Sequence, residues 1–278
     1  MIELIREKEM LGTVIIDVSK FNIDDSIEAF TANTSYEIIT DLSSFNGDGN
    51  EAFLITDSQV KRFIASKLGI GSAVYLHEDT NTSDYSDVLY CIDTLKDMSD
   101  NTLLRMYQRE KNIPWTILET DRCIIREMTV DDLDALYVLY DDPDIKRFIE
   151  DLYEDREREL KFTIDYINNQ YRFFEYGMWI VIDKATGKLI GRAGVFDREG
   201  QDVSEIGFIF DKDYQGKGYA FEVMLAIVEY SKEELYKDNL ISFTKHENVR
   251  AKKLLERLGF TYVGEEEIDL GKFDKYEK

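Results

Sequence analysis

One segment constrains the fold of this chain more than any other: an apolar strand, a glycine-containing loop and a helix follow one another. The strand candidate is Glu205–Phe210, the loop contains Gly216 and Gly218, and the helix candidate is Tyr219–Leu235. The first N–H groups of a helix lack partners inside it, and the helix dipole is positive at that end. Glycine lets another group approach the backbone because it has no Cβ. The junction therefore indicates a phosphate-binding site, with an ordinary helix start after a flexible loop as the alternative.

The elements around this junction predict a mixed α+β domain over residues 119–278. Strands are expected at 123–126, 179–182, 189–195, 205–210, 240–244 and from Phe260, and hairpin turns join the second, third and fourth of them. Helices are expected from Thr129 and at 154–171, 219–235 and 248–258, and Pro143 is expected to interrupt the chain. This order is typical of one mixed sheet covered by helices.

Residues 1–118 predict a separate, smaller α/β domain. Strands at 13–18, 52–56 and 73–76 alternate with helices at 26–32, 59–68 and 99–111. Such alternation indicates parallel strands joined by helices. A change of rhythm near Thr120 marks the expected boundary between the two domains.

The charge of the chain excludes several classes of partner. With 34 Lys and Arg against 57 Asp and Glu, the formal net charge is −23, which repels nucleic acid and anionic membranes. A cationic partner such as an amine is compatible with this charge, although acidity also serves solubility alone.

The apolar runs, the N-terminal residues and the cysteine count indicate the cellular compartment in which the protein is expected. No apolar run approaches the roughly 18 residues that a membrane span needs, and the charged start Met1–Glu7 is unlike a signal peptide. Two cysteines allow neither a disulfide framework nor a structural zinc site. We expect a cytoplasmic protein with reduced thiols and no metal.

Two motifs give the second domain a resemblance to a known family. Gln215-Gly216-Lys217-Gly218-Tyr219-Ala220 resembles the acetyl-CoA pyrophosphate loop of the GNAT N-acetyltransferases. Asn248–Phe260 resembles a later helix of that family, which starts with Asn and ends with Glu, a basic residue, Leu, Gly and Phe. The resemblance spans about residues 120–266 and favours the subgroup that acetylates ribosomal-protein N-termini and related amines. It implies the GNAT fold, with acetyl-CoA as cosubstrate.

The resemblance assigns cofactor contacts to three segments. Backbone groups of Phe208, Ile209 and Phe210 would bind the pantetheine arm as an added strand would. The side-chain amide of Asn248 would also bind the arm, and a helix N-cap is the alternative for this residue. The diphosphate would bind the backbone amides of the loop, which are those of Gln215, Gly216, Lys217, Gly218, Tyr219 and Ala220.

The resemblance also implies a reaction, the direct attack of an amine on the acetyl thioester. The acceptor would be a protein or peptide N-terminus or a small cationic amine. Because such an amine is protonated at neutral pH, a base must remove a proton. Glu205 is the candidate base, with an outward, solvated Glu205 as the alternative and Glu222 as a second candidate.

The chain departs from the family at the leaving thiolate. Leu255 and Ala251 stand where many members carry Tyr and some carry Ser, and Tyr262 or Tyr219 are the possible substitutes. This departure leaves a second function open, an acyl-CoA-binding regulatory or interaction protein with little or no turnover.

Two segments before the phosphate junction have alternative interpretations. An aromatic cluster between Tyr166 and Trp179 forms a core or domain contact, or else a wall of the acceptor pocket. An acidic run between Asp151 and Glu159 steers a cationic acceptor, or else forms a solvated helix face.

The first domain carries a second resemblance. Leu54–Ser58 and the helix after it resemble the later half of haloacid-dehalogenase-like hydrolases. Asp17-Val18-Ser19 offers only one of the two aspartates that the nucleophile motif of that family needs. We therefore expect an accessory domain, which shapes the acceptor site or forms a homodimer contact.

Overall fold

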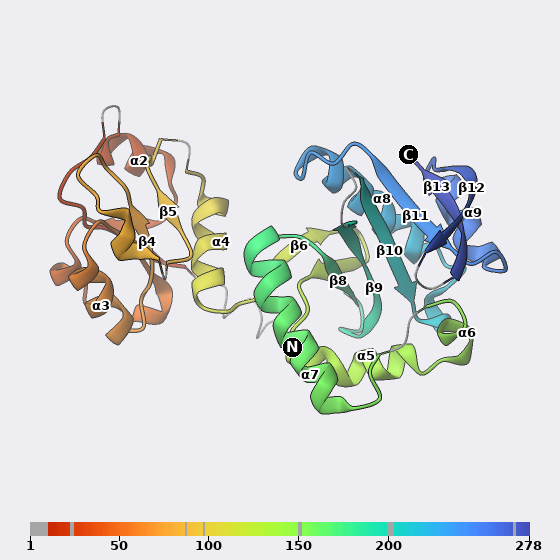
Figure 1. Cartoon of the computed structure of the whole chain (residues 1–278). Helices are drawn as coiled ribbons and strands as arrows, with labels where there is room; N and C mark the ends of the chain where they lie inside the picture. Colours follow the sequence, from red (N-terminus) through yellow and green to blue (C-terminus); the bar gives the residue numbers. More distant parts are fainter. Residues whose placement is uncertain are drawn as a thin grey trace. The chain divides into compact units, whose positions relative to one another are not determined.

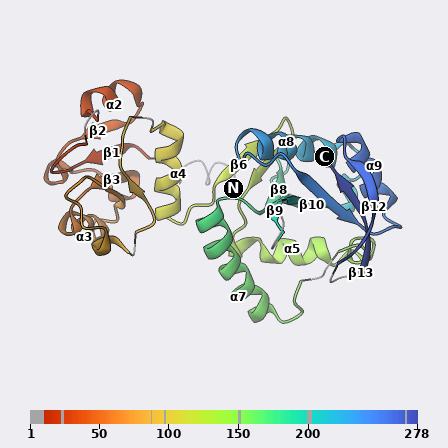
Figure 2. The same cartoon turned by 45° about the horizontal axis from the view of Figure 1, so that its top comes forward.

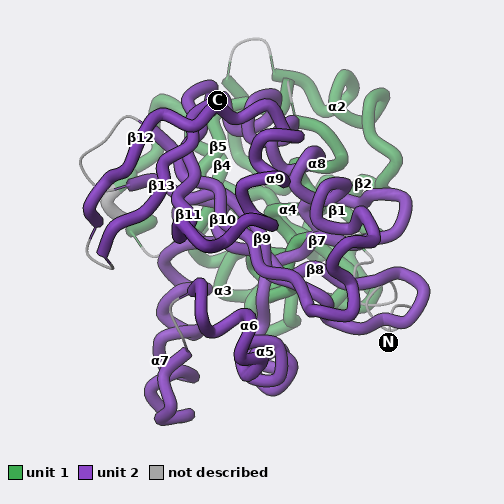
Figure 3. The backbone as a smooth tube through the Cα atoms, turned by 90° about the vertical axis from the view of Figure 1, so that its right-hand side faces the viewer, with its two compact units in different colours: residues 1–115 green, residues 116–278 purple. Residues whose placement is uncertain are grey.

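The computed structural model describes residues 11–22, 25–86, 88–96, 98–149, 152–198, 203–268 and 271–278 of the chain. Contacts divide the chain into two compact units, residues 1–115 and 116–278, which Figure 3 shows in green and purple. The division falls just before the expected boundary at residues 118 and 119. The reason is that β6 (Thr116–Glu119) pairs with β7 (Cys123–Arg126) in the sheet of the second unit.

The first unit is a parallel sheet with helices on both faces (Figure 1). Its strand order is β2-β1-β3-β4-β5, and every neighbouring pair is parallel. The strands are β1 (Thr13–Ile16), β2 (Glu37–Ile39), β3 (Ala52–Thr56), β4 (Gly71–Tyr75) and β5 (Cys91–Ile92). The helices are α2 (Ile27–Asn33), α3 (Gln59–Lys67) and α4 (Asp100–Glu110). A serine caps each helix, since Ser26, Ser58 and Ser99 all accept a bond from a first-turn amide.

Successive side chains along a strand point to opposite faces of the sheet, so neighbouring strand residues contact helices on different faces. Ile16 packs with Phe30 of α2 and Leu103 of α4, whereas the preceding Ile15 packs with Ala65 of α3. The expected order of strands and helices is present, and β2 and β5 are additional short strands.

The second unit is an eight-stranded mixed sheet in the order β12-β13-β11-β10-β9-β8-β7-β6. Neighbouring strands are antiparallel except β10 and β11, which are parallel. The remaining strands are β8 (Met178–Asp183), β9 (Leu189–Asp197), β10 (Ser204–Phe210), β11 (Leu240–Thr244), β12 (Thr261–Ile268) and β13 (Gly271–Glu277). This is the mixed sheet that the sequence predicts for the GNAT fold.

Helices cover both faces of this second sheet. They are α5 (Leu133–Tyr140), α6 (Pro143–Lys146), α7 (Arg156–Tyr166), α8 (Tyr219–Glu233) and α9 (Val249–Arg257). In Figure 2, α8 lies on one face of the sheet and α5 and α7 lie on the other. Trp179 of β8 accordingly contacts Tyr230 of α8, while Arg192 of β9 contacts Tyr140 of α5. None of the helices in the described segments is long and apolar enough to cross a membrane.

Strands β10 and β11 separate soon after they begin, and this separation positions the site. β10 pairs with β9 along its whole length but with β11 only at Ser204 and Glu205. Because the two strands are parallel, they end at the same edge of the sheet. The helices that follow them, α8 and α9, therefore both start beside the gap.

Three local predictions differ from the structure. The strand predicted from Phe260 is a hairpin, β12 and β13, and β13 inserts between β12 and β11. Pro143 starts α6 instead of only interrupting the chain, because a first-turn residue needs no N–H for the helix. The helix predicted over 154–171 is α7 followed by a π-helical segment, Ile167–Phe174.

Candidate active site

A cavity of about 710 Å³ opens where β10 and β11 separate. Its wall combines the end of β10, the loop before α8, residues along α9, and α6. The predicted cofactor residues in the lining are Phe208, Ile209, Phe210, Gln215, Gly216, Gly218, Ala220 and Asn248. The other two, Lys217 and Tyr219, are outside it. The Tyr219 ring instead stacks on the Arg122 guanidinium, 4.0 Å from the ring centre.

Two glycines shape the loop before α8. Gly216 and Gly218 have φ angles of +71° and +86°, which side chains with a Cβ adopt poorly. A Cβ on Gly216 would meet no atom within 4 Å, so the backbone there is uncovered. The Glu222 N–H donates to the Gly218 carbonyl at 3.0 Å, so the hydrogen-bond ladder of α8 begins there. The amides of residues 216–220 lie before that ladder and are left for a ligand.

Gln215 has a different role from the glycines. Its amide donates to the Lys212 carbonyl at 3.2 Å, and its Nε2 donates to the Phe210 carbonyl at 2.8 Å. Its Oε1 accepts a bond from Arg250 at 2.7 Å. Gln215 thus ties the loop to β10 and α9, and the loop amides without a backbone partner in the described segments start at Gly216.

Arg122 and Glu222 hold the loop from outside the cavity, and no local pattern in the sequence indicates this pair. Arg122 Nε lies 2.6 Å from Glu222 Oε2, the Arg122 amide donates to Oε1, and Nη1 donates to the Lys217 carbonyl at 3.1 Å. Burial raises the pKa of Glu222, but hydrogen bonds from Thr120 and Arg122 outweigh it, so the net pKa is lowered. Glu222 is therefore an ionised partner of Arg122 and a poor candidate for the base.

Arg122→Met is expected to weaken CoA binding by about tenfold, or about 1.4 kcal/mol. The Lys217 carbonyl loses its donor, so the loop amides are no longer held in one arrangement. Titration calorimetry measures the affinity. Arg156→Met is the matched control, because Arg156 also pairs with a carboxylate, Asp134, and stacks on Tyr137. Equal CoA affinity in the two variants would contradict the bracing role.

Asn248 caps α9 and lines the cavity at the same time. Its Oδ1 accepts a bond from the Ala251 amide at 3.1 Å, which leaves Nδ2 for a ligand. Ala251 lines the cavity, whereas Leu255 is fully buried. Tyr219 and Tyr262 line neither this cavity nor the second one. Among the described residues, the lining of the first cavity contains no hydroxyl or thiol side chain.

A second cavity of about 540 Å³ meets the first one. The residues that line both are Phe148, Ile149, Phe208, Ile209, Asn248 and Ala251. The rest of its wall includes six aromatic side chains, those of Tyr140, Tyr153, Phe162, Tyr166, Phe196 and Phe243. Of the predicted aromatic cluster, Tyr166 lines this cavity, whereas Tyr171 and Trp179 are fully buried.

Glu205 lines the second cavity and pairs with Arg198 at 3.1 Å. Its side chain is only 15% exposed, which excludes the outward, solvated alternative. Burial raises the pKa of Glu205, the neighbouring Arg198 lowers it, and the charge of Glu266 raises it slightly further. The net pKa is about 7. Near neutral pH the carboxyl group therefore exists in both protonation states, as a general base requires.

The acidic run contributes one carboxylate to the second cavity. Glu159 is buried, lines the cavity and accepts a bond from the Tyr153 amide at 2.9 Å. Glu154, Asp155 and Glu157 are exposed, and Asp151 lies outside the described residues. The exposed members of the run fit a solvated helix face, and the steering of a cationic acceptor stays a prediction.

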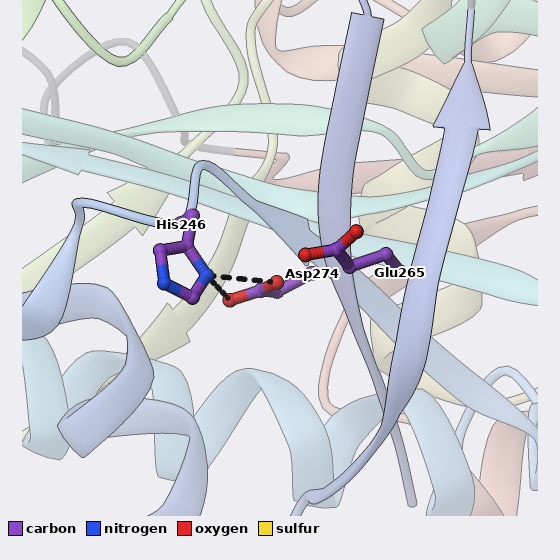
Figure 4. A group of neighbouring side chains, drawn as sticks. All are labelled: His246, Glu265 and Asp274. Carbon is purple, nitrogen blue, oxygen red and sulfur yellow. Dashed lines mark hydrogen bonds and ion pairs between the residues drawn. The ribbon is translucent and has the colours of Figure 1, made fainter.

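One group of side chains has the composition of a metal site (Figure 4). Ligand atoms of His246, Glu265 and Asp274 lie within 4.8 Å of one another. The Lys252 ammonium group also contacts the buried Asp274, which His246 approaches to 3.2 Å. Lys252 Nζ also lies 3.4 Å from His246 Nδ1, so the lysine already contacts two of the three possible ligands. These contacts join α9 to β13 and belong to neither cavity.

Polar residues of the first unit gather after its parallel strands. Lys61 pairs with Asp17 at 2.6 Å, the Ser19 amide donates to Asp57 at 2.7 Å, and His77 lies 3.2 Å from Asp57. Asp17 follows β1, Asp57 follows β3 and His77 follows β4. The resemblance to haloacid-dehalogenase-like hydrolases and the accessory role of this domain stay predictions.

Comparisons with known proteins match the second unit. A family model described as an acetyltransferase (GNAT) domain matches residues 122–261, which is half of the chain. The uncharacterized protein YkkB of Bacillus subtilis is 31% identical over 153 residues, covering 53% of this chain and 86% of YkkB. The uncharacterized N-acetyltransferase YnaD of the same organism is 27% identical over 148 residues, covering 53% of this chain and 84% of YnaD.

A solved structure supports the fold. A putative ribosomal-protein-serine acetyltransferase from Vibrio cholerae has a TM-score of 0.52 at 17% identity, covering 59% of this chain and 97% of that chain. The family match covers the glycine loop, strands β10 and β11, and the whole of the helix that Asn248 caps. The chain therefore belongs to the GNAT family of acetyltransferases.

Proposed function

We propose that the protein transfers an acetyl group from acetyl-CoA to a primary amine by direct attack in a ternary complex. One observation carries this proposal: two cavities of different chemistry meet at Phe208 and Ile209, where β10 has parted from β11. Uncovered amides line the first cavity, and the Glu159 and Glu205 carboxyl groups line the second. Such an arrangement suits a phosphate-bearing donor on one side and an amine on the other.

The charges of the first cavity support CoA as its occupant. Its basic lining residues are Lys212, Arg250, Lys253 and Arg257, against the acidic Asp144 and Glu247. This local excess of positive charge occurs in a chain with a net charge of −23. The amides of residues 216–220 and the positive end of α8 would hold the diphosphate. Ionised phosphates form strong, charge-assisted bonds with such donors.

Strand alternation indicates which β10 groups would bind the pantetheine arm. The Ser204 amide donates to Asn239 just before β11, and the Asp211 amide donates to Ile190 beside β9. Backbone groups of an extended strand alternate in direction, so those of Phe208 and Phe210 point toward the gap. We propose that these two N–H groups bind the arm and polarise the thioester carbonyl, as an oxyanion hole does. Ile209 would contribute its side chain.

Glu205 would accept the amine proton by way of water in the second cavity. Its pKa of about 7 lets it take a proton near neutral pH without being permanently protonated. Glu159 would attract the cationic acceptor into the same cavity.

The leaving thiolate would depart without a tyrosine. No described side chain of the first cavity carries a hydroxyl or thiol proton, but Asn248 Nδ2 can donate a hydrogen bond. A thiol with a pKa of about 8.5, as in cysteine, is a fair leaving group without protonation. Turnover is therefore compatible with Leu255 and Ala251.

Calorimetry with CoA, followed by thiol-release assays with acetyl-CoA, tests the proposed function. The acceptors are an N-terminal peptide, a polyamine and an aminoglycoside. We expect CoA binding and amine-dependent release of CoA. No binding at millimolar CoA would contradict the proposal, and binding without amine-dependent release would favour the acyl-CoA-binding regulatory alternative. A homodimer and cytoplasmic localisation stay predictions.

A further inference from the structure

Arg192 of β9 lies in the floor of the second cavity. In the register between β9 and β10, Arg192 is opposite Ile209, and Phe196 is opposite Glu205. Opposed residues, and residues two apart on one strand, project from the same face of a sheet. Gly207 lies between Glu205 and Ile209 and has no side chain. The floor therefore has a guanidinium at one end and a carboxyl group at the other, and the Met178 and Phe196 side chains lie against Gly207 between them.

Among the residues that the structure describes, the Arg192 guanidinium has polar contacts but no counter-ion. Its Nη1 donates to the Tyr140 hydroxyl at 3.2 Å, and its Cζ is 5.8 Å from the centre of the Tyr166 ring. Its Nε is buried and has no hydrogen-bond partner. Within the described ranges, no carboxylate lies within 4.0 Å of Arg192. The nearby Arg126 differs, because it forms two bonds with Asp132.

An unpaired charge in a cavity is unfavourable until a ligand compensates for it. Removing a guanidinium from water costs free energy that only an anion or several hydrogen bonds restore. In the described part of the chain, the one hydrogen bond of Arg192 is that from Nη1. Its planar group can bind a carboxylate through two parallel bonds, a geometry that a lysine cannot offer.

We propose that the acceptor carries a carboxylate close to its amine, and that Arg192 binds this carboxylate and so determines acceptor specificity. The proposal rests on the proposed function and narrows its acceptor from any cationic amine to a zwitterionic one. Arg192 is opposite Ile209, which lines both cavities, so the bound carboxylate lies beside the place of acetyl transfer. Only a short spacer then separates the carboxylate from the attacking amine.

Two kinds of acceptor have this chemistry. One is a free amino acid, whose α-carboxylate is next to its amine. The other is a peptide whose second residue is Asp or Glu, which places a side-chain carboxylate near the N-terminal amine. The aromatic wall formed by Tyr140, Tyr153, Phe162 and Phe196 favours an acceptor that also has an apolar side chain.

Matched acceptors test the proposal in the full chain. Phenylalanine, phenylalaninamide and phenethylamine share a ring and an amine, but only the first has a carboxylate. Leucine, leucinamide and isoamylamine form a second set. Peptides that begin Ser-Asp and Ser-Asn form a third. With acetyl-CoA saturating, we expect kcat/KM to favour the carboxylate-bearing member of at least one set by about 30-fold.

Arg192 variants assign that preference to one side chain. Arg192→Gln is expected to abolish the preference, mainly through a higher KM for the carboxylate-bearing acceptor, and Arg192→Lys to retain only part of it. Calorimetry with CoA checks that each variant is folded. Arg158→Gln is the control, because Arg158 stacks on Tyr153 of the same cavity wall at 3.9 Å without lining the cavity. It should keep the preference.

The outcomes separate this inference from the proposed function. Preference for the amino acids identifies free amino acids as acceptors, and preference for the Ser-Asp peptide identifies acidic N-termini. Equal or better acetylation of the amides and simple amines would overturn the inference and leave the proposed function intact. A preference that survives in Arg192→Gln would overturn it as well. Failure of every acceptor would overturn both.

Discussion

Gly216→Glu is expected to weaken CoA binding by at least about 100-fold, or about 2.7 kcal/mol. Gly216 lines the first cavity, and a Cβ there would point into open space. The new carboxylate would therefore lie where we propose the diphosphate, and like charges at close range repel. Titration calorimetry with CoA measures the loss. A retained affinity would mean that the diphosphate binds elsewhere.

Gly187→Glu is the matched control for this substitution. Gly187, in the turn between β8 and β9, has a φ of +68°, and a Cβ there would also meet no atom within 4 Å. Both variants pay the same backbone cost, about 1–2 kcal/mol for a side chain in the left-handed region. Gly187→Glu should thus lower the melting temperature about as much as Gly216→Glu does while keeping CoA affinity. Equal loss of CoA binding in both would indicate a general effect of instability.

Glu205→Gln is expected to lower kcat by about 100-fold or more, the usual contribution of a general base. In the unaltered protein, kcat/KM should rise with pH through about 7, because burial raises the pKa of Glu205 and only the ionised carboxylate accepts a proton. The variant should lose this part of the pH profile and keep its CoA affinity. A second rise, at the pKa of the acceptor amine, should remain and should move when the amine is changed.

Glu266→Gln provides the control for that profile. Glu266 raises the pKa of Glu205 through its charge, less strongly than burial does. Its removal should move the Glu205 step to lower pH without a large loss of rate. A pH profile that is unchanged in Glu205→Gln would contradict the assignment of Glu205 as the base.

The sequence predicted the features that depend on residues close together in the chain. The strand, the glycine loop and the start of α8 lie within a few residues of one another, and glycine at positive φ followed by free helix amides is a local property. The same holds for Thr129, where a helix was expected to start and which forms a capping box with Asp132. These local signals were sufficient to predict the order of strands and helices in the second unit and to identify the family.

The tertiary structure decided which charges are paired and which are left for a ligand. Arg122 and Glu222 are 100 residues apart, and no local pattern connects them. The pKa of Glu205 depends on burial beneath other elements, and Arg192 stands out only because the fold brings no carboxylate to it within the described residues. The sequence likewise did not predict that β13 lies between β11 and β12 in the sheet. Hydrogen bonding within a turn or helix start is short-range and readable from spacing, whereas desolvation and ion pairing depend on which distant segments the folded chain brings together.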